Sequence, residues 1–124
     1  MKRLTLVITL LTLLFAGSRC FASPSLGVGF LTVSRPVDQC IQRAARVFEM
    51  EGYTVTPGTD NNVYGISGPF NATIICTPAP GGLTQVAFVV SADAGSSGDL
   101  AKELGKLQSR LKESESDPNW DRKR

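Results

Sequence analysis

The chain carries few residues that could perform catalysis. It contains no histidine, so the commonest general base and the usual activator of a nucleophile are both absent. Paired carboxylates could act alone, as in glycoside hydrolysis, where two acids face each other across a cleft. The candidates Asp60, Asp93 and Asp99 all lie in predicted turns or at a helix end, where acidic residues have ordinary structural roles. We therefore predict a non-enzymatic protein without catalytic residues, with a small carboxylate-dependent hydrolase as the alternative.

Cysteines are the second set of reactive side chains. Cys40 and Cys76 lie far apart in the sequence, and two thiols in an oxidising compartment usually pair. Two isolated cysteines without histidine supply only half of a zinc site, and the C-x-x-C spacing of redox-active pairs is absent. We predict a structural disulfide between Cys40 and Cys76, and neither a metal nor a cofactor.

The N-terminal segment has the layout of a secretory signal peptide. Lys2 and Arg3 precede an apolar run, Leu4 to Phe15, and small residues lead to a cleavage point after Ala22. The run is shorter than the roughly 20 apolar residues that a membrane-spanning helix requires. We predict that residues 1–22 are removed and that the mature protein is secreted or periplasmic.

Two alternatives concern this segment. A lipid attached to Cys20 is disfavoured because Arg19 precedes it, where lipoprotein signals carry a small residue. Cleavage after Ser18 would instead leave Cys20 as an unpaired thiol.

Removal of the signal changes the charge of the protein. Three positive charges leave with it, so the formal net charge falls from +2 to −1. Nucleic-acid binding is not expected, since no basic surplus remains to neutralise a phosphate backbone. Residues 23–113 fit a single domain. Residues 114–124 are polar and contain Pro118, which predicts a flexible tail.

The domain is predicted to begin with a strand, Leu26–Val33, that is apolar on both faces and therefore buried. Gly27 and Gly29 lie within it. The third glycine of a nucleotide-binding motif is missing, so these two are expected to mark a bulge or close backbone packing.

A helix is predicted after Pro36, with Gly52 at its end. Its apolar stripe follows three- and four-residue spacing and consists of Val37, Cys40, Ile41, Ala44 and Phe48. Three charged residues fall off the stripe and are expected to be solvated, namely Arg43, Arg46 and Glu49.

Four short strands separated by turn signals follow, which predicts antiparallel hairpins: Tyr53–Thr56, Val63–Ser67, Ala72–Thr77 and Thr84–Ser91. In the third of them Ala72, Ile74 and Cys76 share a face. If that face is turned toward the helix, Cys76 can reach Cys40.

A second helix is predicted from Leu100, with a capping box formed by Ser96 and Asp99. Its apolar stripe consists of Leu100, Leu104, Leu107 and Leu111. The pattern is too short for a coiled coil, so the helix is expected to pack on the sheet.

These elements predict an α+β fold, a two-layer sandwich with four to five antiparallel or mixed strands. Both helices would cover one face of the sheet, close to a ferredoxin-like plan. The other face is the expected contact surface, with Tyr53, Tyr64 and Thr73 as candidate residues. Trp120 could form a further contact from the tail, and an edge strand could join a partner's sheet.

The predicted function is that of a small exported, non-catalytic protein that binds a partner protein or small ligand in the cell envelope. No membrane span is expected after signal cleavage. A structural component of the envelope without a discrete ligand is a further alternative.

Overall fold

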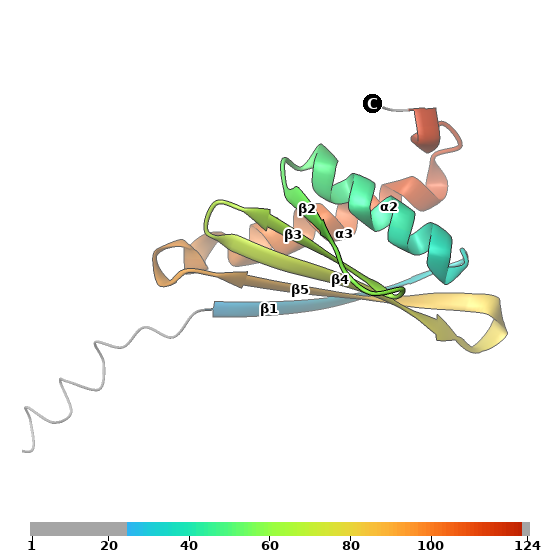
Figure 1. Cartoon of the computed structure of the whole chain (residues 1–124), viewed down its shortest axis with the longest axis horizontal. Helices are drawn as coiled ribbons and strands as arrows, with labels where there is room; N and C mark the ends of the chain where they lie inside the picture. Colours follow the sequence, from blue (N-terminus) through green and yellow to red (C-terminus); the bar gives the residue numbers. More distant parts are fainter. Residues whose placement is uncertain (1–24, 123–124) are drawn as a thin grey trace, which may run out of the picture.

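The computed structural model describes residues 25–122, which form two layers: a five-stranded sheet, and two helices packed on one of its faces (Figure 1). The elements in chain order are β1 (Ser25–Val33), α2 (Val37–Met50), β2 (Thr54–Pro57), β3 (Asn62–Ser67), β4 (Phe70–Ala79), η1 (Pro80–Gly82), β5 (Leu83–Ala92), η2 (Ala94–Asp99), α3 (Leu100–Ser116) and η3 (Trp120–Arg122). The α+β sandwich predicted from the sequence is confirmed. The predicted signal peptide, residues 1–22, lies outside the described residues.

The sheet is entirely antiparallel and has the strand order β1-β5-β4-β3-β2. Strands β2 to β5 follow one another as a meander, and β1 is added beside β5. This connectivity differs from the β-α-β-β-α-β order of the ferredoxin-like plan, in which an α-helix connects the first strand to the second and the third strand to the fourth. Here the turn at Gly68 joins β3 to β4, and η1 with Gly81 and Gly82 joins β4 to β5. All three glycines have positive φ, and no α-helix separates these strands.

The core lies between the sheet and the helices. Ala72, Ile74 and Cys76 of β4 are buried and point toward the helices, as predicted. The predicted stripes of both helices are confirmed, because Cys40, Ala44, Phe48, Leu100, Leu107 and Leu111 are buried and Val37, Ile41 and Leu104 pack against them.

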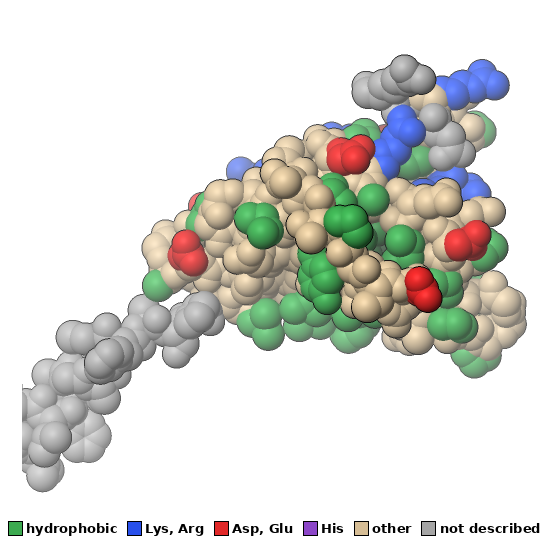
Figure 2. Space-filling view, in the orientation of Figure 1, with side chains coloured by type: hydrophobic (Ala, Val, Ile, Leu, Met, Phe, Trp, Pro, Cys, Tyr) green, Lys and Arg blue, Asp and Glu red, His purple; other side chains and the backbone are tan. Residues whose placement is uncertain are grey.

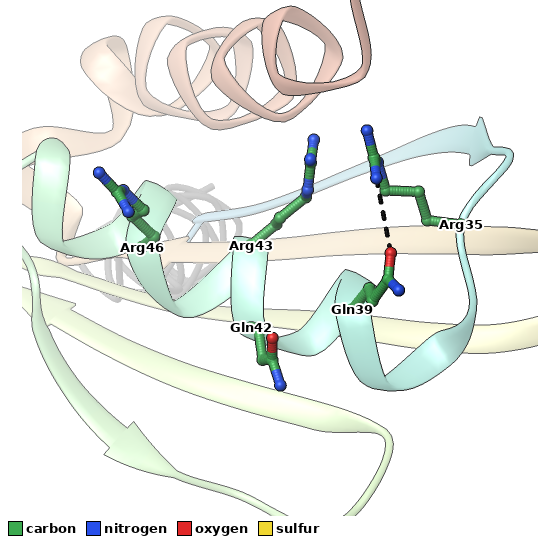
Figure 3. Close-up of a pocket in the computed structure, with 5 residues that line it drawn as sticks. All are labelled: Arg35, Gln39, Gln42, Arg43 and Arg46. Carbon is green, nitrogen blue, oxygen red and sulfur yellow. Dashed lines mark hydrogen bonds between the residues drawn. The ribbon is translucent and has the colours of Figure 1, made fainter. Parts of the chain in front are cut away.

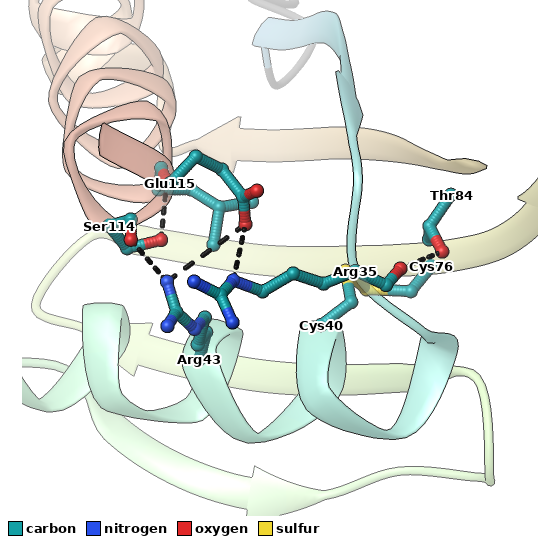
Figure 4. The surroundings of a disulfide bond; sticks show 8 residues. Arg35, Cys40, Arg43, Cys76, Thr84, Ser114 and Glu115 are labelled. Carbon is teal, nitrogen blue, oxygen red and sulfur yellow. Dashed lines mark hydrogen bonds and ion pairs between the residues drawn. A yellow bond between two sulfur atoms is a disulfide. The ribbon is translucent and has the colours of Figure 1, made fainter. Parts of the chain in front are cut away.

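A disulfide joins Cys40 to Cys76, as the sequence predicts (Figure 4). Both residues are almost fully buried. The bond links the first turns of α2 to the centre of the sheet, and so connects the two layers covalently.

One of the two predicted helix ends is confirmed by the structure, and the other is not. Gly52 has φ of +80° and follows the end of α2, as predicted. The capping box is wrong, because Asp99 makes no side-chain cap hydrogen bond at the start of α3. Instead, residues 94–99 form the 3₁₀ helix η2, and the Leu100 N–H donates to the carbonyl of Ser97.

Two further predictions are corrected by the structure. β1 is an edge strand, and alternate residues along it are exposed, so it is not buried on both faces. At the C-terminus α3 continues to Ser116, and Trp120 is only 1 % exposed. The polar composition of residues 114–124 does not indicate this packing, because it depends on one aromatic residue, Trp120, whose side chain is buried in the core.

No helix in residues 25–122 is long and apolar enough to cross a membrane.

Candidate functional site

The face of the sheet that the helices leave bare is the most distinctive surface of the molecule, and we call it the open face. Antiparallel pairing places residues of one parity from each strand on this face. The cross-strand pairs Leu26–Ser91, Val28–Val89 and Phe30–Ala87 join β1 to β5 there. On the same face Thr73 lies opposite both Val89 of β5 and Tyr64 of β3.

The open face is apolar and carries no charge. None of the five strands contains an Asp, Glu, Lys or Arg. The exposed large hydrophobic residues of the described chain all belong to this face: Leu26, Val28, Phe30, Tyr64, Ile66 and Leu83. Figure 2 shows hydrophobic side chains gathered along the side of the molecule opposite the helices. Contiguous exposed apolar surface of this kind marks an interaction site more often than scattered hydrophobic residues do.

A shallow hollow of about 350 Å³ lies on the open face. Tyr64, Ile66, Thr73 and Val89 contribute to its lining, and Leu26 stands at the β1 side. Leu26 is 64 % exposed and Ile66 is 50 % exposed, so these two walls of the hollow stand open to solvent. The arrangement suits contact with a broad surface better than enclosure of a small molecule.

The candidate contact residues from the sequence are placed differently by the structure. Tyr64 and Thr73 lie opposite each other on the open face, as expected. Tyr53 and Trp120 are buried in the hydrophobic core and do not belong to this face. Tyr53 precedes β2, and its N–H donates to the carbonyl of Phe48, which directs its ring toward the helices.

Tyr53 is held in the core by packing and by a carboxylate. Its ring centroid lies 5.2 Å from that of Phe48, and its hydroxyl donates to Glu103 of α3 at 3.0 Å. Burial raises the pKa of Tyr53 far above its usual value, and the hydrogen bond and negative charge of Glu103 raise it further. The phenol therefore stays neutral and joins the start of β2 to α3.

The helix layer carries a second, polar hollow of about 440 Å³, lined by Arg35, Gln39, Gln42, Arg43 and Arg46 (Figure 3). Arg35 pairs with Glu115 at 3.2 Å, and Arg43 lies 3.9 Å from the same carboxylate. Arg43 also donates from Nη1 to the carbonyl of Ser114 (Figure 4).

These contacts correct the prediction that Arg43 is solvated, because it is 7 % exposed. Its guanidinium is buried where α2 meets the end of α3, a junction that the sequence pattern of either helix alone does not show. The arrangement ties the two helices together.

The acidic residues considered for catalysis do not form a facing pair across a cleft. Asp60 lies in the turn before β3, and Asp93 follows β5 near the turn between β3 and β4, where its N–H donates to the carbonyl of Pro69. Asp60 and Asp93 are thus at opposite ends of β3, while Asp99 is the last residue of η2, and all three are exposed. Within the described residues, no group of three or more His, Cys, Asp or Glu could hold a metal ion.

Sequence reasoning missed the role of β1 in the open face. Gly27 and Gly29 lie on its inner side. A Cβ at Gly29 would overlap the side-chain amide of Gln108 in α3, whereas a Cβ at Gly27 would meet Leu100 and Leu104 at ordinary contact distances of 3.4–3.5 Å. The close packing predicted for these glycines is therefore confirmed at Gly29. In the sequence, Gly27 and Gly29 alternate with Leu26, Val28 and Phe30. This alternation is the signal that could have predicted that β1 turns its large apolar side chains toward the open face.

No protein-family model matches the chain, and no curated protein does. Among solved structures, the chain is similar to the crystal structure of DR_A0006 from Deinococcus radiodurans, with a TM-score of 0.44 and 11 % sequence identity. The similarity covers 74 % of this chain and 95 % of that one.

Proposed function

We propose that the protein is a small exported, non-catalytic protein that binds a partner protein through its open face. The observation that carries this proposal is the position of the exposed large hydrophobic residues within residues 25–122, all of which lie on one uncharged side of the sheet. Burial of such surface is favourable by about 25 cal/mol per Å² of apolar area.

The chemistry of the face specifies the kind of partner. A charged side chain buried against it would lose its hydration without meeting an opposite charge, which is costly. Threonine and asparagine side chains lie among the hydrophobic ones on this face, such as Thr73 opposite Tyr64 and Val89, and can donate and accept hydrogen bonds. We therefore expect a partner surface that is itself uncharged and largely apolar, with a few neutral polar groups.

Export is supported by two features of the chain. Residues 1–22 have the layout of segments that direct proteins out of the cytoplasm. The Cys40–Cys76 disulfide is a bond that persists in oxidising compartments and is rare in reducing ones. The proposed location is the periplasm or the extracellular space.

Site-specific photocrosslinking in cells tests the binding proposal. A photoreactive amino acid replaces Ile66 on the open face, and in a matched variant it replaces Ser109, which is exposed on α3. The proposal predicts a discrete crosslinked species from position 66 that is absent from position 109. That species should disappear when Tyr64→Lys is added, because the new charge would be desolvated in the complex. Crosslinks that are equal from both positions, or absent from both, would refute it.

A further inference from the structure

The two edges of the sheet are protected to very different degrees. β2 has four residues and ends in Pro57, so it offers little to a pairing strand. β1 has nine residues and contains neither a proline nor a charge. Natural proteins normally blunt an exposed edge with charged residues, proline or a covering element. The β1 edge carries none of these sequence devices.

The contacts of α3 cover the inner face of β1 and leave its edge free. Leu100 and Leu104 lie over Gly27, and Gln108 lies over Gly29. Among residues 25–122, β5 is the strand that pairs with β1, on one side. Every second residue of β1 therefore directs its N–H and C=O away from β5, toward the outer edge.

We propose that β1 pairs with β1 of a second copy of this chain, antiparallel, about a twofold axis at Gly29. The two sheets then become one continuous sheet of ten strands. In this register Val28 lies opposite Phe30 of the second copy, and Leu26 lies opposite Thr32. The parity of the strand is preserved, so both open faces lie on the same side and both helix layers on the other.

A second copy fits this edge better than a foreign strand because β1 is self-complementary. In twofold pairing, a residue near the axis lies close to the same residue of the second copy. A charged residue at such a position would therefore be repelled by its own copy. β1 has no charge, and Val28–Phe30 is a β-branched–aromatic pair of the kind that stabilises antiparallel strands. Gln108 lies above Gly29, close to the axis, and its amide can both donate to and accept from the symmetric Gln108.

This inference goes beyond the proposed function, because it uses the edge of the sheet and not its centre. Pairing at β1 would double the length of the uncharged face without covering it. The dimer and the partner complex can therefore each exist without the other.

Sedimentation equilibrium at about 100 µM, above the micromolar Kd expected of a small interface, tests the dimer. Wild-type mature protein should be dimeric. Val28→Lys should weaken dimerisation at least about tenfold, because it places lysines close to both sides of the axis. Ile66→Lys, on the same face but on β3, should leave the dimer within about twofold of wild type. A monomeric wild-type protein, or equal loss in both variants, would overturn the proposal.

Cysteine crosslinking tests the register in a nearly wild-type background. Copies with Val28→Cys mixed with copies with Phe30→Cys should form intermolecular disulfides faster than copies with Val28→Cys mixed with copies with Ile66→Cys. Equal rates in the two mixtures would overturn the pairing, as would crosslinking to an unrelated protein in preference to a second copy. The Ile66→Lys variant separates the two proposals, because it should lose the partner protein and keep the dimer.

Discussion

Loss of the Cys40–Cys76 disulfide is predicted to remove a large part of the stability of the fold. The two cysteines are 36 residues apart in sequence. In the chain-entropy account, a cross-link that closes a loop of this length destabilises the unfolded state by ~4 kcal/mol. A domain of this size has a total free energy of unfolding of about 5–15 kcal/mol. Reduction should therefore bring the protein close to its unfolding threshold.

Urea unfolding at equilibrium measures this effect in two ways. The first comparison is the oxidised wild-type protein with and without a reductant, which breaks the bond and leaves no cavity. The second is the double variant Cys40→Ala and Cys76→Ala, which also loses two buried sulfur atoms. Because the reduced unfolded chain is more expanded, the dependence of the free energy on urea concentration should become steeper as stability falls.

The size and order of these losses check the reasoning. We expect a loss of ~4 kcal/mol on reduction and a somewhat larger loss in the double variant, with the fold retained in the absence of urea. A reduced protein within about 1 kcal/mol of the oxidised one would contradict the account, because the disulfide would then contribute little to holding the two layers together.

Three other predictions concern single side chains. The pKa of Tyr53 is raised in the folded state, so its contribution to stability is complete below pH of about 10 and is lost as pH rises further. Urea titrations at increasing pH should show a smaller alkaline loss in Tyr53→Phe than in the wild-type protein, and an equal loss in the two would contradict this role of Tyr53. Gly65→Ala should lower the free energy of unfolding by about 1–3 kcal/mol, because the new Cβ would overlap the ring of Phe48. Gly105→Ala in α3 places a Cβ that meets no atom within 4 Å, and it should raise the free energy of unfolding by about 1 kcal/mol. Thermal unfolding of the two variants measures both changes. Trp120→Ala should cost about 3–5 kcal/mol in urea unfolding, and an effect below 1 kcal/mol would contradict its burial.

Local patterns in the sequence were sufficient to predict the two layers and the bond between them. The spacing of Cys40, Ala44 and Phe48 defines the buried side of α2, and the alternation of Ala72, Ile74 and Cys76 defines the buried side of β4. Together they place the two sulfurs on facing surfaces before the order of the strands is known.

The contact surface could be predicted only in part, because it depends on which strands become edges. Tyr64 lies on the open face as predicted, but Tyr53 is turned inward by the end of α2. The exposed side of β1 was missed because glycines, and not polar residues, alternate with its large apolar side chains. Burial of Arg43 and Trp120 depends on where the end of α3 meets α2, which no local pattern specifies.

The measurement that tests the proposed function most directly is the affinity of the protein that crosslinks to position 66, once purified, for three forms of this chain. These are the wild type, Ile66→Lys on the open face, and Ser109→Lys, which adds the same charge to the helix layer. We predict that Ile66→Lys weakens binding at least about a hundredfold, because a buried charge without a counter-charge costs about 3 kcal/mol or more, and that Ser109→Lys binds like wild type. Equal affinities for all three forms would contradict the assignment of the open face as the binding surface.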